Sequence, residues 1–329
     1  MPSNAPLILF WTRYFDKPVD IVEWSQCSVP VEWTNDRRRL AEADAVVFHL
    51  PNSREIGDAC KYPGQLWVAW SMESVVNYPA MADASFMRHF DVVMTYEAAS
   101  DVWTPYLPRA GWWDAARNEP IPPRVESALA VHFQSSGFNK SGRDTFVTEL
   151  SRHIAVDCYG RYRSNRQITG PDLGRQTKLE TIGRYPFCLA LENSIAPDYV
   201  TEKMFDPLAA GTVPVYLGAP NAGEFVPEGS YIDAASYRTP AELAAYLRHL
   251  AETPGDYQAY FAWRSRPLPD RLARRLDELE APVQRRLAEL VHRHAQQRSG
   301  RLSGRPSLPF GAISFLRTRL RRGRAERDR

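Results

Sequence analysis

The features that the sequence lacks exclude several classes of protein. No apolar run approaches the ~20 residues that a membrane-spanning helix requires. The first residues, MPSNAPLILFWTRYF, have no positively charged start followed by a long apolar region, so they do not resemble a signal peptide. The four cysteines lie far apart with no CxxC pair, which indicates neither a zinc site nor a disulfide framework. We therefore expect a cytoplasmic protein.

The sequence also lacks a strong charge of either sign. Lysine and arginine number 41 and aspartate and glutamate 39, so no overall field favours nucleic acid as a partner. With 44% hydrophobic and 24% charged residues, the chain is typical of a soluble globular protein. A length of 329 residues allows two domains of ordinary size.

Short apolar runs alternate with helix-like stretches, which predicts an α/β protein with parallel sheets. Residues 108–124 carry four prolines and no periodicity, which predicts a linker between two α/β halves. We place the first domain at 1–115, the linker at 116–124, the second domain at 125–267, and C-terminal helices with a basic tail at 268–329. The predicted strands span 7–11, 45–50, 66–70 and 92–95 in the first half, and 128–133, 154–158, 187–191 and 212–217 in the second.

The C-terminal region differs in character from the rest of the chain. Residues 270–298 are rich in Leu, Arg, Glu and Ala at helical spacing and predict one or two helices, with Pro282 as the break. The tail then carries seven arginines beyond Leu316 and an apolar face formed by Phe310, Ile313, Leu316 and Leu320. Such an element suits the anionic inner face of the inner membrane, where each arginine contributes about 1 kcal/mol. A solvated basic tail fits the same pattern, and both interpretations stay open.

The most informative segment spans residues 187–218, FCLALENSIAPDYVTEKMFDPLAAGTVPVYLG. An apolar strand runs into a polar loop, Thr201 opens a helix that ends at Gly211, and a second apolar strand follows. Polar residues thus gather at a strand's carboxyl end and a helix's amino end, the edge where nucleotides bind in open α/β sheets. The helix N-terminus offers unpaired N–H groups to a phosphate, and Lys203 adds a full charge.

One residue conflicts with the helix predicted at 202–210. Pro207 falls inside it, where proline costs ~3 kcal/mol relative to alanine. Either the helix kinks there or its first turn is distorted.

The run ENSIAPDYVTEKMFDPLAAGTVPVYLGAP closely resembles the donor-binding signature of the α-1,3/4-fucosyltransferases (glycosyltransferase family 10), which use GDP-fucose. Weaker pieces follow the family's order, among them LWVAWSMES at 66–74 and SSGFNKSGRDTFVTEL at 135–150, and the similarity covers roughly residues 7–264. The resemblance implies the GT-B fold, in which two Rossmann-like domains face each other across a cleft. The acceptor would bind the first domain and the donor the second. Animal relatives carry an N-terminal membrane helix, and this sequence looks like the bacterial type without one.

The resemblance implies two cations for the diphosphate of GDP-fucose. Arg143 matches an arginine of the family that contacts the diphosphate, and its planar fork suits phosphate oxygens. Without the family match, Arg143 would be interpreted as an exposed residue in the first turn of a helix. Lys203 is predicted to lie in the first turn of the helix, where its positive charge opposes the helix dipole. A bound anion would offset this unfavourable placement.

Four further residues are expected at the donor site, and two of them match donor-binding positions of the family. Tyr199 and Glu202 are implied to hold the nucleoside, with Glu202 on the ribose hydroxyls, although Glu202 could also cap the helix together with Thr201. Asn193 lies just past the strand end, and from this position we expect it to touch the sugar or the phosphate. For Glu192, donor contact and a structural role within the loop stay equally open.

Glu73, in LWVAWSMES, matches the family's proposed general base. It follows a strand, and its apolar neighbours Trp70 and Met72 would raise its pKa toward neutrality, which suits a base. An exposed loop glutamate is the alternative from the residues alone. The family commonly has a proline after this motif, whereas Val75 stands here, which weakens inferences about the acceptor.

The chain contains no DxD, so the aspartate pair that usually chelates a metal is missing. We therefore predict that no metal or other cofactor is required and that cations of the protein stabilise the leaving GDP. One base opposite the leaving group predicts single displacement with inversion, giving an α-fucoside on the 3-hydroxyl of N-acetylglucosamine or glucose in a lactosamine-type glycan. The alternatives are a GT-B enzyme with another nucleotide sugar and a non-catalytic nucleotide-sugar or glycan-binding protein.

Overall fold

The computed structural model describes residues 5–298 and 304–311, and the chain forms two compact units. Unit 1 contains residues 1–104 and 281–329, and unit 2 contains residues 105–280. The predicted boundaries differ from this division mainly at the C-terminus, where 268–329 is shared between the units instead of forming a region of its own. The predicted basic amphipathic tail lies almost wholly outside the described residues.

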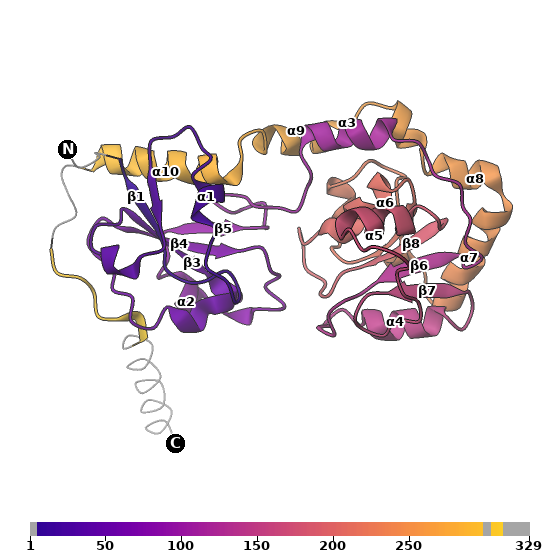
Figure 1. The fold of residues 1–329 in the computed structure, drawn as a ribbon, viewed down its shortest axis with the longest axis horizontal. Helices are drawn as coiled ribbons and strands as arrows, with labels where there is room; N and C mark the ends of the chain where they lie inside the picture. Colours follow the sequence, from indigo (N-terminus) through magenta and orange to yellow (C-terminus); the bar gives the residue numbers. More distant parts are fainter. Residues whose placement is uncertain (1–4, 299–303, 312–329) are drawn as a thin grey trace, which may run out of the picture. The chain divides into compact units, whose positions relative to one another are not determined.

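Unit 1 is built on a parallel sheet of five strands in the order β2-β1-β3-β4-β5. Helix α10 lies along this sheet (Figure 1), and its Leu287, Ala288 and Val291 share a core with Ile8 of β1 and Val47 of β3. The strands are β1 (Leu7–Phe10), β2 (Glu32–Thr34), β3 (Ala45–His49), β4 (Leu66–Ser71) and β5 (Val92–Thr95), and the helices α1 (Ile21–Trp24), α2 (Ala84–Met87) and α10 (Val283–Gln297).

Unit 2 repeats the plan with a parallel sheet in the order β10-β9-β8-β6-β7. Its strands are β6 (Ala130–Phe133), β7 (Val156–Tyr159), β8 (Phe187–Leu191), β9 (Val213–Leu217) and β10 (Ile232–Asp233). Its helices are α3 (Ala110–Asn118), α4 (Arg143–Leu150), α5 (Arg175–Ile182), α6 (Glu202–Ala209), α7 (Pro240–Glu252), α8 (Pro254–Ala259) and α9 (Asp270–Glu278).

The strands of unit 2 are buried on both faces, as their continuous apolar runs predict. Leu150 of α4 and Leu247 of α7 pack with Leu189 on one face of the sheet. Ile182, the last residue of α5, packs with Val131 and Cys188, which point to the other face because side chains alternate along a strand. The loops at the strand ends are thereby left to carry the polar residues.

All eight predicted strands are confirmed, each within two residues of the observed ends. The two strands that sequence analysis missed, β2 and β10, are the outermost strands of their sheets and only 3 and 2 residues long. The break at Pro282 is also confirmed, since α9 ends before it and α10 begins directly after it.

The predicted linker at 108–124 is wrong for its first part, which forms helix α3. Trp113 of α3 is fully buried and packs edge-on against Phe205 and Trp263, so aromatic packing holds a helix that has no clear apolar periodicity. Three of the four prolines of the segment, Pro120, Pro122 and Pro123, follow the helix end, where proline is well tolerated. No helix in the described part of the chain is both long and apolar enough to cross a membrane.

Candidate active site

Each sheet has a point at which the strand order reverses, between β1 and β3 in unit 1 and between β6 and β8 in unit 2. In open parallel sheets, ligands bind beyond the carboxyl ends of the strands at such a point. Glu192 and Asn193 directly follow β8, and Arg143 begins the helix after β6. Glu73 follows β4, the neighbour of β3. The predicted residues thus belong to two groups, one in each unit.

Glu192 organises the N-terminus of α6. It is fully buried, and its two carboxylate oxygens accept hydrogen bonds from the backbone N–H and the hydroxyl of Thr201, each at 2.8 Å. Thr201 is the N-cap of α6, and its Oγ1 accepts from the backbone N–H of Lys203 at 3.4 Å. The structural role that the sequence left open for Glu192 is therefore present in the fold.

Lys203 lies among three oxygens at the same helix end. Its Nζ is 3.0 Å from Thr201 Oγ1, 3.2 Å from Glu202 Oε1 and 3.4 Å from Glu192 Oε2. Burial acts to lower the pKa of Lys203, but the charges of Glu192 and Glu202 outweigh burial and raise this pKa. The ammonium group is therefore charged at neutral pH, and its side chain keeps 21% of its surface exposed.

Arg143, the first residue of α4, is a buried cation with only 3% of its surface exposed. Its terminal nitrogens donate to three backbone carbonyl oxygens, those of Phe138 at 2.9 Å, Ser136 at 3.1 Å and Leu191 at 3.4 Å. Its Nε has no hydrogen-bond partner, and no carboxylate of the described chain forms an ion pair with it. Burial lowers the pKa of Arg143, against the opposing charges of Asp144 and Glu192. Within the described residues, the guanidinium therefore hydrogen-bonds to backbone carbonyl oxygens, while Asp144 and Glu192 act on it through their charge.

The two cations belong to one cluster, because the charge of Arg143 acts on the pKa of Lys203 and the charges of Glu192 and Glu202 act on both. We call Arg143, Glu192, Glu202 and Lys203 the donor-side cluster. The Ser141 hydroxyl ties its two loops together by donating to the carbonyl oxygen of Glu192 at 2.6 Å. Among residues 5–298 and 304–311, no group of three or more His, Cys, Asp or Glu side chains could hold a metal ion.

The remaining predicted donor residues differ in exposure. Glu202 keeps 48% of its side chain exposed, and Lys203 and Lys178 lower its pKa although burial acts to raise it. Asn193 is half-buried and accepts a hydrogen bond from the Lys140 backbone N–H at its carbonyl oxygen. Tyr199, by contrast, is 1% exposed and lies edge-on to Tyr106, so its ring is part of the packed interior.

Sequence analysis missed two residues that hold Glu192 in place. The hydroxyl of Tyr216, on β9, lies 3.5 Å from Glu192 Oε1 and also donates to the Tyr199 carbonyl oxygen at 3.3 Å. Gly218 passes so close to this pair that an added Cβ would collide with the Tyr216 hydroxyl and with Cγ of Glu192. The sequence signal for this close approach is a glycine placed directly after the second apolar strand.

In unit 1, Glu73 lies beside a group of aromatic side chains. Its backbone N–H donates to the Ser71 hydroxyl at 3.0 Å, at the end of β4. Burial and then the charge of Glu73 raise the pKa values of Tyr14 and Tyr78, so both phenols lie near this carboxylate. Trp70, on β4, stacks with Tyr14 at 5.1 Å between ring centroids and lies 5.2 Å from His49, its register partner on β3.

We call Tyr14, His49, Trp70 and Glu73 the acceptor-side cluster. His49 is 1% exposed, and burial lowers its pKa to about 4, so the ring is neutral at neutral pH. Its Nδ1 lies 2.9 Å from Asn52 Oδ1. Tyr14 is 38% exposed and Phe15, next to it, is 39% exposed at a positive φ of 54°. The cluster therefore presents aromatic faces to solvent beside a carboxylate.

Family models match both units. Residues 3–107 match the model described as "Fucosyltransferase, N-terminal", and residues 124–299 match "Glycosyltransferase family 10 (fucosyltransferase) C-term".

Curated relatives and solved structures are similar to the chain over most of its length. The sequence is 33% identical over 276 residues to the 4-galactosyl-N-acetylglucosaminide 3-alpha-L-fucosyltransferase FUT6 of Pan troglodytes, covering 79% of this chain and 73% of that protein. It is 33% identical over 294 residues to the 3-galactosyl-N-acetylglucosaminide 4-alpha-L-fucosyltransferase FUT3 of the same species, covering 84% and 74%. A crystal structure of an alpha1,3-fucosyltransferase with GDP-fucose superposes with a TM-score of 0.60 at 14% identity, covering 93% of this chain and 95% of that one. The fold is therefore GT-B, as predicted.

Proposed function

Because the chain belongs to glycosyltransferase family 10, the fucosyltransferases, we propose that it transfers L-fucose from GDP-fucose to the 3-hydroxyl of N-acetylglucosamine, or of glucose, in a lactosamine-type glycan. The two relatives described above are named for galactosyl-N-acetylglucosaminide acceptors, one for the 3-position and one for the 4-position. The observation that carries a nucleoside-diphosphate donor is the buried Arg143, which has no carboxylate partner within the described part of the chain.

Arg143 and Lys203 bind the diphosphate in this proposal. A buried cation without an anionic partner is costly, and a bound anion removes that cost. The N-terminus of α6 adds its unpaired N–H groups and partial positive charge. Glu202, which is about half exposed beside Lys203, accepts hydrogen bonds from the ribose hydroxyls. Asn193 contacts the sugar or the phosphate.

Glu192 and Tyr199 act through other residues. Both oxygens of Glu192 are engaged by Thr201, so Glu192 holds Thr201 and Lys203 in position and is a positioning residue. Tyr199 is buried beneath the same loop, and its carbonyl oxygen accepts from Tyr216. It supports the nucleoside site from within the fold.

No metal or other cofactor is required in this proposal, because protein cations carry the role of stabilising the leaving group. As the bond between C1 of fucose and the β-phosphate oxygen breaks, negative charge grows on GDP and is stabilised by Lys203 and Arg143. This support is fixed before the reaction begins, so no reorganisation is needed as the charge develops.

Glu73 is the general base. It accepts the proton of the acceptor hydroxyl while that oxygen bonds to C1 of fucose, and GDP departs from the opposite face. The single displacement inverts a β-linked donor into an α-fucoside through an oxocarbenium-like transition state. The aromatic rings of Trp70 and Tyr14 beside Glu73 give the acceptor sugar an apolar surface on which to pack.

The experiment is an assay of the full chain with GDP-fucose and N-acetyllactosamine, with EDTA in one arm. We expect an α-1,3-fucosylated product at the same rate with and without EDTA. Higher turnover with another nucleotide sugar would show that the enzyme uses a donor other than GDP-fucose. Tight GDP-fucose binding without any product on lactosamine or lactose acceptors would indicate a binding protein.

A further inference from the structure

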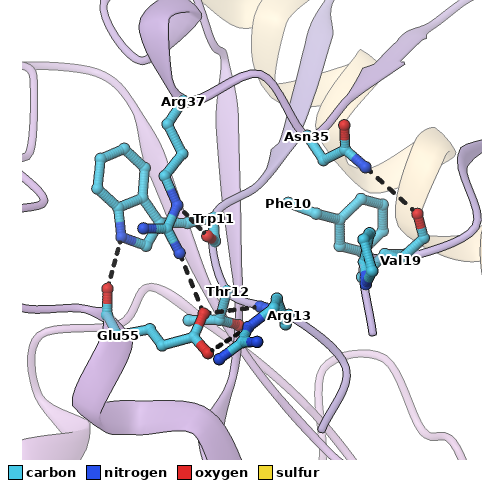
Figure 2. A pocket seen from close by; sticks show the side chains of 9 residues that line it. Phe10, Trp11, Thr12, Arg13, Val19, Asn35, Arg37 and Glu55 are labelled. Carbon is cyan, nitrogen blue, oxygen red and sulfur yellow. Dashed lines mark hydrogen bonds and ion pairs between the residues drawn. The ribbon is translucent and has the colours of Figure 1, made fainter. Parts of the chain in front are cut away.

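A cavity of about 580 Å³ lies at the strand-order reversal of unit 1. Its walls come from the loops that follow three neighbouring strands, β2, β1 and β3, all at their carboxyl ends (Figure 2). This is the position at which open parallel sheets bind ligands. The lining residues are Phe10, Trp11, Thr12, Arg13, Pro18, Val19, Asn35, Arg37 and Glu55.

The cavity carries more positive than negative charge. Arg13 and Arg37 both pair with the single carboxylate of Glu55, at 2.8 Å and 3.1 Å, which leaves one positive charge in excess among the lining residues. Figure 2 shows the carboxylate between the two guanidinium groups. In the described structure, neither terminal nitrogen of Arg13 nor Nη1 of Arg37 donates to a protein acceptor. These N–H groups are available to a ligand.

The guanidinium of Arg37 is held in place rather than free in solvent. Its Nε donates to the Trp11 carbonyl oxygen at 2.7 Å, and its Cζ lies 5.0 Å from the centroid of the Trp11 ring. The Trp11 indole in turn donates to the Glu55 carbonyl oxygen at 3.0 Å. A fixed guanidinium loses little freedom when it binds an anion, so its contribution to affinity is larger than that of a mobile surface arginine.

The loop after β1 links this cavity to the acceptor-side cluster. Arg13 lines the cavity, and the next residue, Tyr14, stacks on Trp70 near Glu73. Strand β4, which Glu73 follows, is two strands away from β1, or about 10 Å at the usual spacing of strands. A short oligosaccharide spans that distance.

We propose that this cavity is an acceptor subsite that binds a sugar carrying an anionic group, a carboxylate or a phosphate, through Arg13 and Arg37. The inference rests on the proposed fucosyl transfer and deepens it by defining the class of acceptor. The sugar to be fucosylated lies at Glu73, and a further unit of the same glycan places its anion on the terminal N–H groups of Arg13 and Arg37 that do not bond to Glu55. The apolar walls of Phe10 and Val19 pack on the body of that unit.

The test compares three acceptors with the full chain and GDP-fucose: N-acetyllactosamine, the same glycan carrying a sialic acid, and the same glycan carrying a phosphate on galactose. The sialylated glycan tests a carboxylate and the phosphorylated one a phosphate. We expect at least one of the two to have a kcat/KM about tenfold above that of the neutral glycan, mainly through a lower KM, which corresponds to one charge-assisted hydrogen bond.

The variants are Arg13→Gln and Arg37→Gln, with Arg38→Gln as the matched control. Arg38 neighbours Arg37 but pairs with Asp36 and keeps 90% of its side chain exposed. Each cavity variant should lower the ratio of anionic to neutral kcat/KM about tenfold, while Arg38→Gln leaves that ratio unchanged. Because Arg13 is 55% exposed, its replacement is compatible with folding even if that of Arg37 is not.

Equal kcat/KM for neutral and anionic acceptors would overturn this inference and leave fucosyl transfer intact. An equal fall of the ratio in Arg38→Gln would also overturn it, since a general surface charge would then explain the preference. Absence of fucosyl transfer to all three acceptors would instead count against the proposed function. In that case, titration of the protein with sialyl-N-acetyllactosamine still tests the cavity, and binding that Arg13→Gln does not weaken would overturn the subsite.

Discussion

Units 1 and 2 have the same architecture but carry different chemistry at the same edge of their sheets. In unit 1 the carboxyl edge carries aromatic rings, and six of the nine tryptophans fall before residue 105. In unit 2 the same edge carries buried ions, with Glu192 fully buried and Arg143 3% exposed. The fold therefore determines where a ligand binds, and the side chains at the strand ends determine which ligand.

The physical contrast extends to how each edge responds to substitution. Aromatic faces suit the apolar surfaces of a sugar, and their packing tolerates the change of one polar neighbour. Buried charges of opposite sign compensate one another. Removing one of them leaves its partner as an uncompensated charge in a medium of low dielectric constant. Replacing one charged residue should therefore affect chemistry in unit 1, and both binding and stability in unit 2.

The largest expected effect is on turnover, from Glu73→Gln in unit 1. Loss of the general base should lower kcat about a thousandfold, because acid–base catalysis contributes ~10²–10⁴ in rate. Glu73 lies in unit 1 and the donor-side cluster in unit 2, so GDP affinity by calorimetry should stay the same. Glu42→Gln, an exposed carboxylate paired with Arg39, is the control. A Glu73→Gln enzyme with near-normal turnover would show that another group takes the proton.

The next effect is a pH dependence of stability that arises from buried histidine. His49 has a pKa of about 4 in the folded chain against 6.5 for an unperturbed ring, so the unfolded state binds the extra proton between these values. Stability from this residue is present above pH 6.5 and is lost as pH falls toward 4, by roughly 3 kcal/mol in all. His132 of unit 2 is also buried with a lowered pKa and contributes with the same sign.

This dependence can be measured by urea unfolding followed by tryptophan fluorescence at several pH values between 7 and 4. His49→Gln should reduce the slope of the free energy of unfolding against pH by up to about one proton. His132→Gln should reduce this slope in the same direction, because His132 is also buried with a lowered pKa. His153→Gln, at an exposed position, is the control. A free energy of unfolding that falls as steeply between pH 7 and 4 in His49→Gln as in the parent protein would show that the burial of His49 does not cause the pH dependence of stability.

The third effect is on donor affinity, from Lys203→Ala in unit 2. GDP binding should weaken by about 10- to 100-fold, the contribution of a charge-assisted contact. Arg152→Ala, an exposed cation paired with Glu149, should leave GDP affinity unchanged. Unchanged affinity in Lys203→Ala would contradict the diphosphate role.

A double variant separates affinity from stability. Lys203→Ala leaves Glu192 buried without its cation, so thermal unfolding should occur at a lower temperature. Lys203→Met combined with Glu192→Gln removes both charges and keeps their volumes. It should regain stability without regaining GDP affinity, whereas recovery of both would assign Lys203 a purely structural role.

The fold could be predicted because its strands are short apolar runs, buried on both faces and bounded by polar loops. The edge strands β2 and β10 are too short for a periodic signal, and α3 is held by Trp113 packing against residues distant in sequence. The N-cap at Thr201 was readable because capping is local. The order of the strands in each sheet depends on contacts between residues distant in sequence. This order determines which loops lie next to each other at the carboxyl edge of the sheet.

The candidate site shows the same limit. Lys203 and Glu202 are adjacent in sequence and could be found from one motif, but the contacts of Arg143 with the carbonyl oxygens of 136 and 138 needed the folded loop. Tyr14, His49 and Trp70 come together only because β1, β3 and β4 are neighbours in the sheet. The sequence left the role of Glu192 open, and its bonds to Thr201 show a structural role.

The path of the chain has a consequence for biosynthesis. Unit 2 is inserted within unit 1, since α10, with Leu287, Ala288 and Val291 in the first core, follows the whole of unit 2. Residues 307–311 then return to unit 1, where backbone N–H groups of Ser307, Phe310 and Gly311 donate to carbonyl oxygens of the segment 57–61. A ribosome making this chain therefore completes the later unit while the earlier sheet still exposes an apolar face, and that nascent face needs protection from aggregation until translation ends.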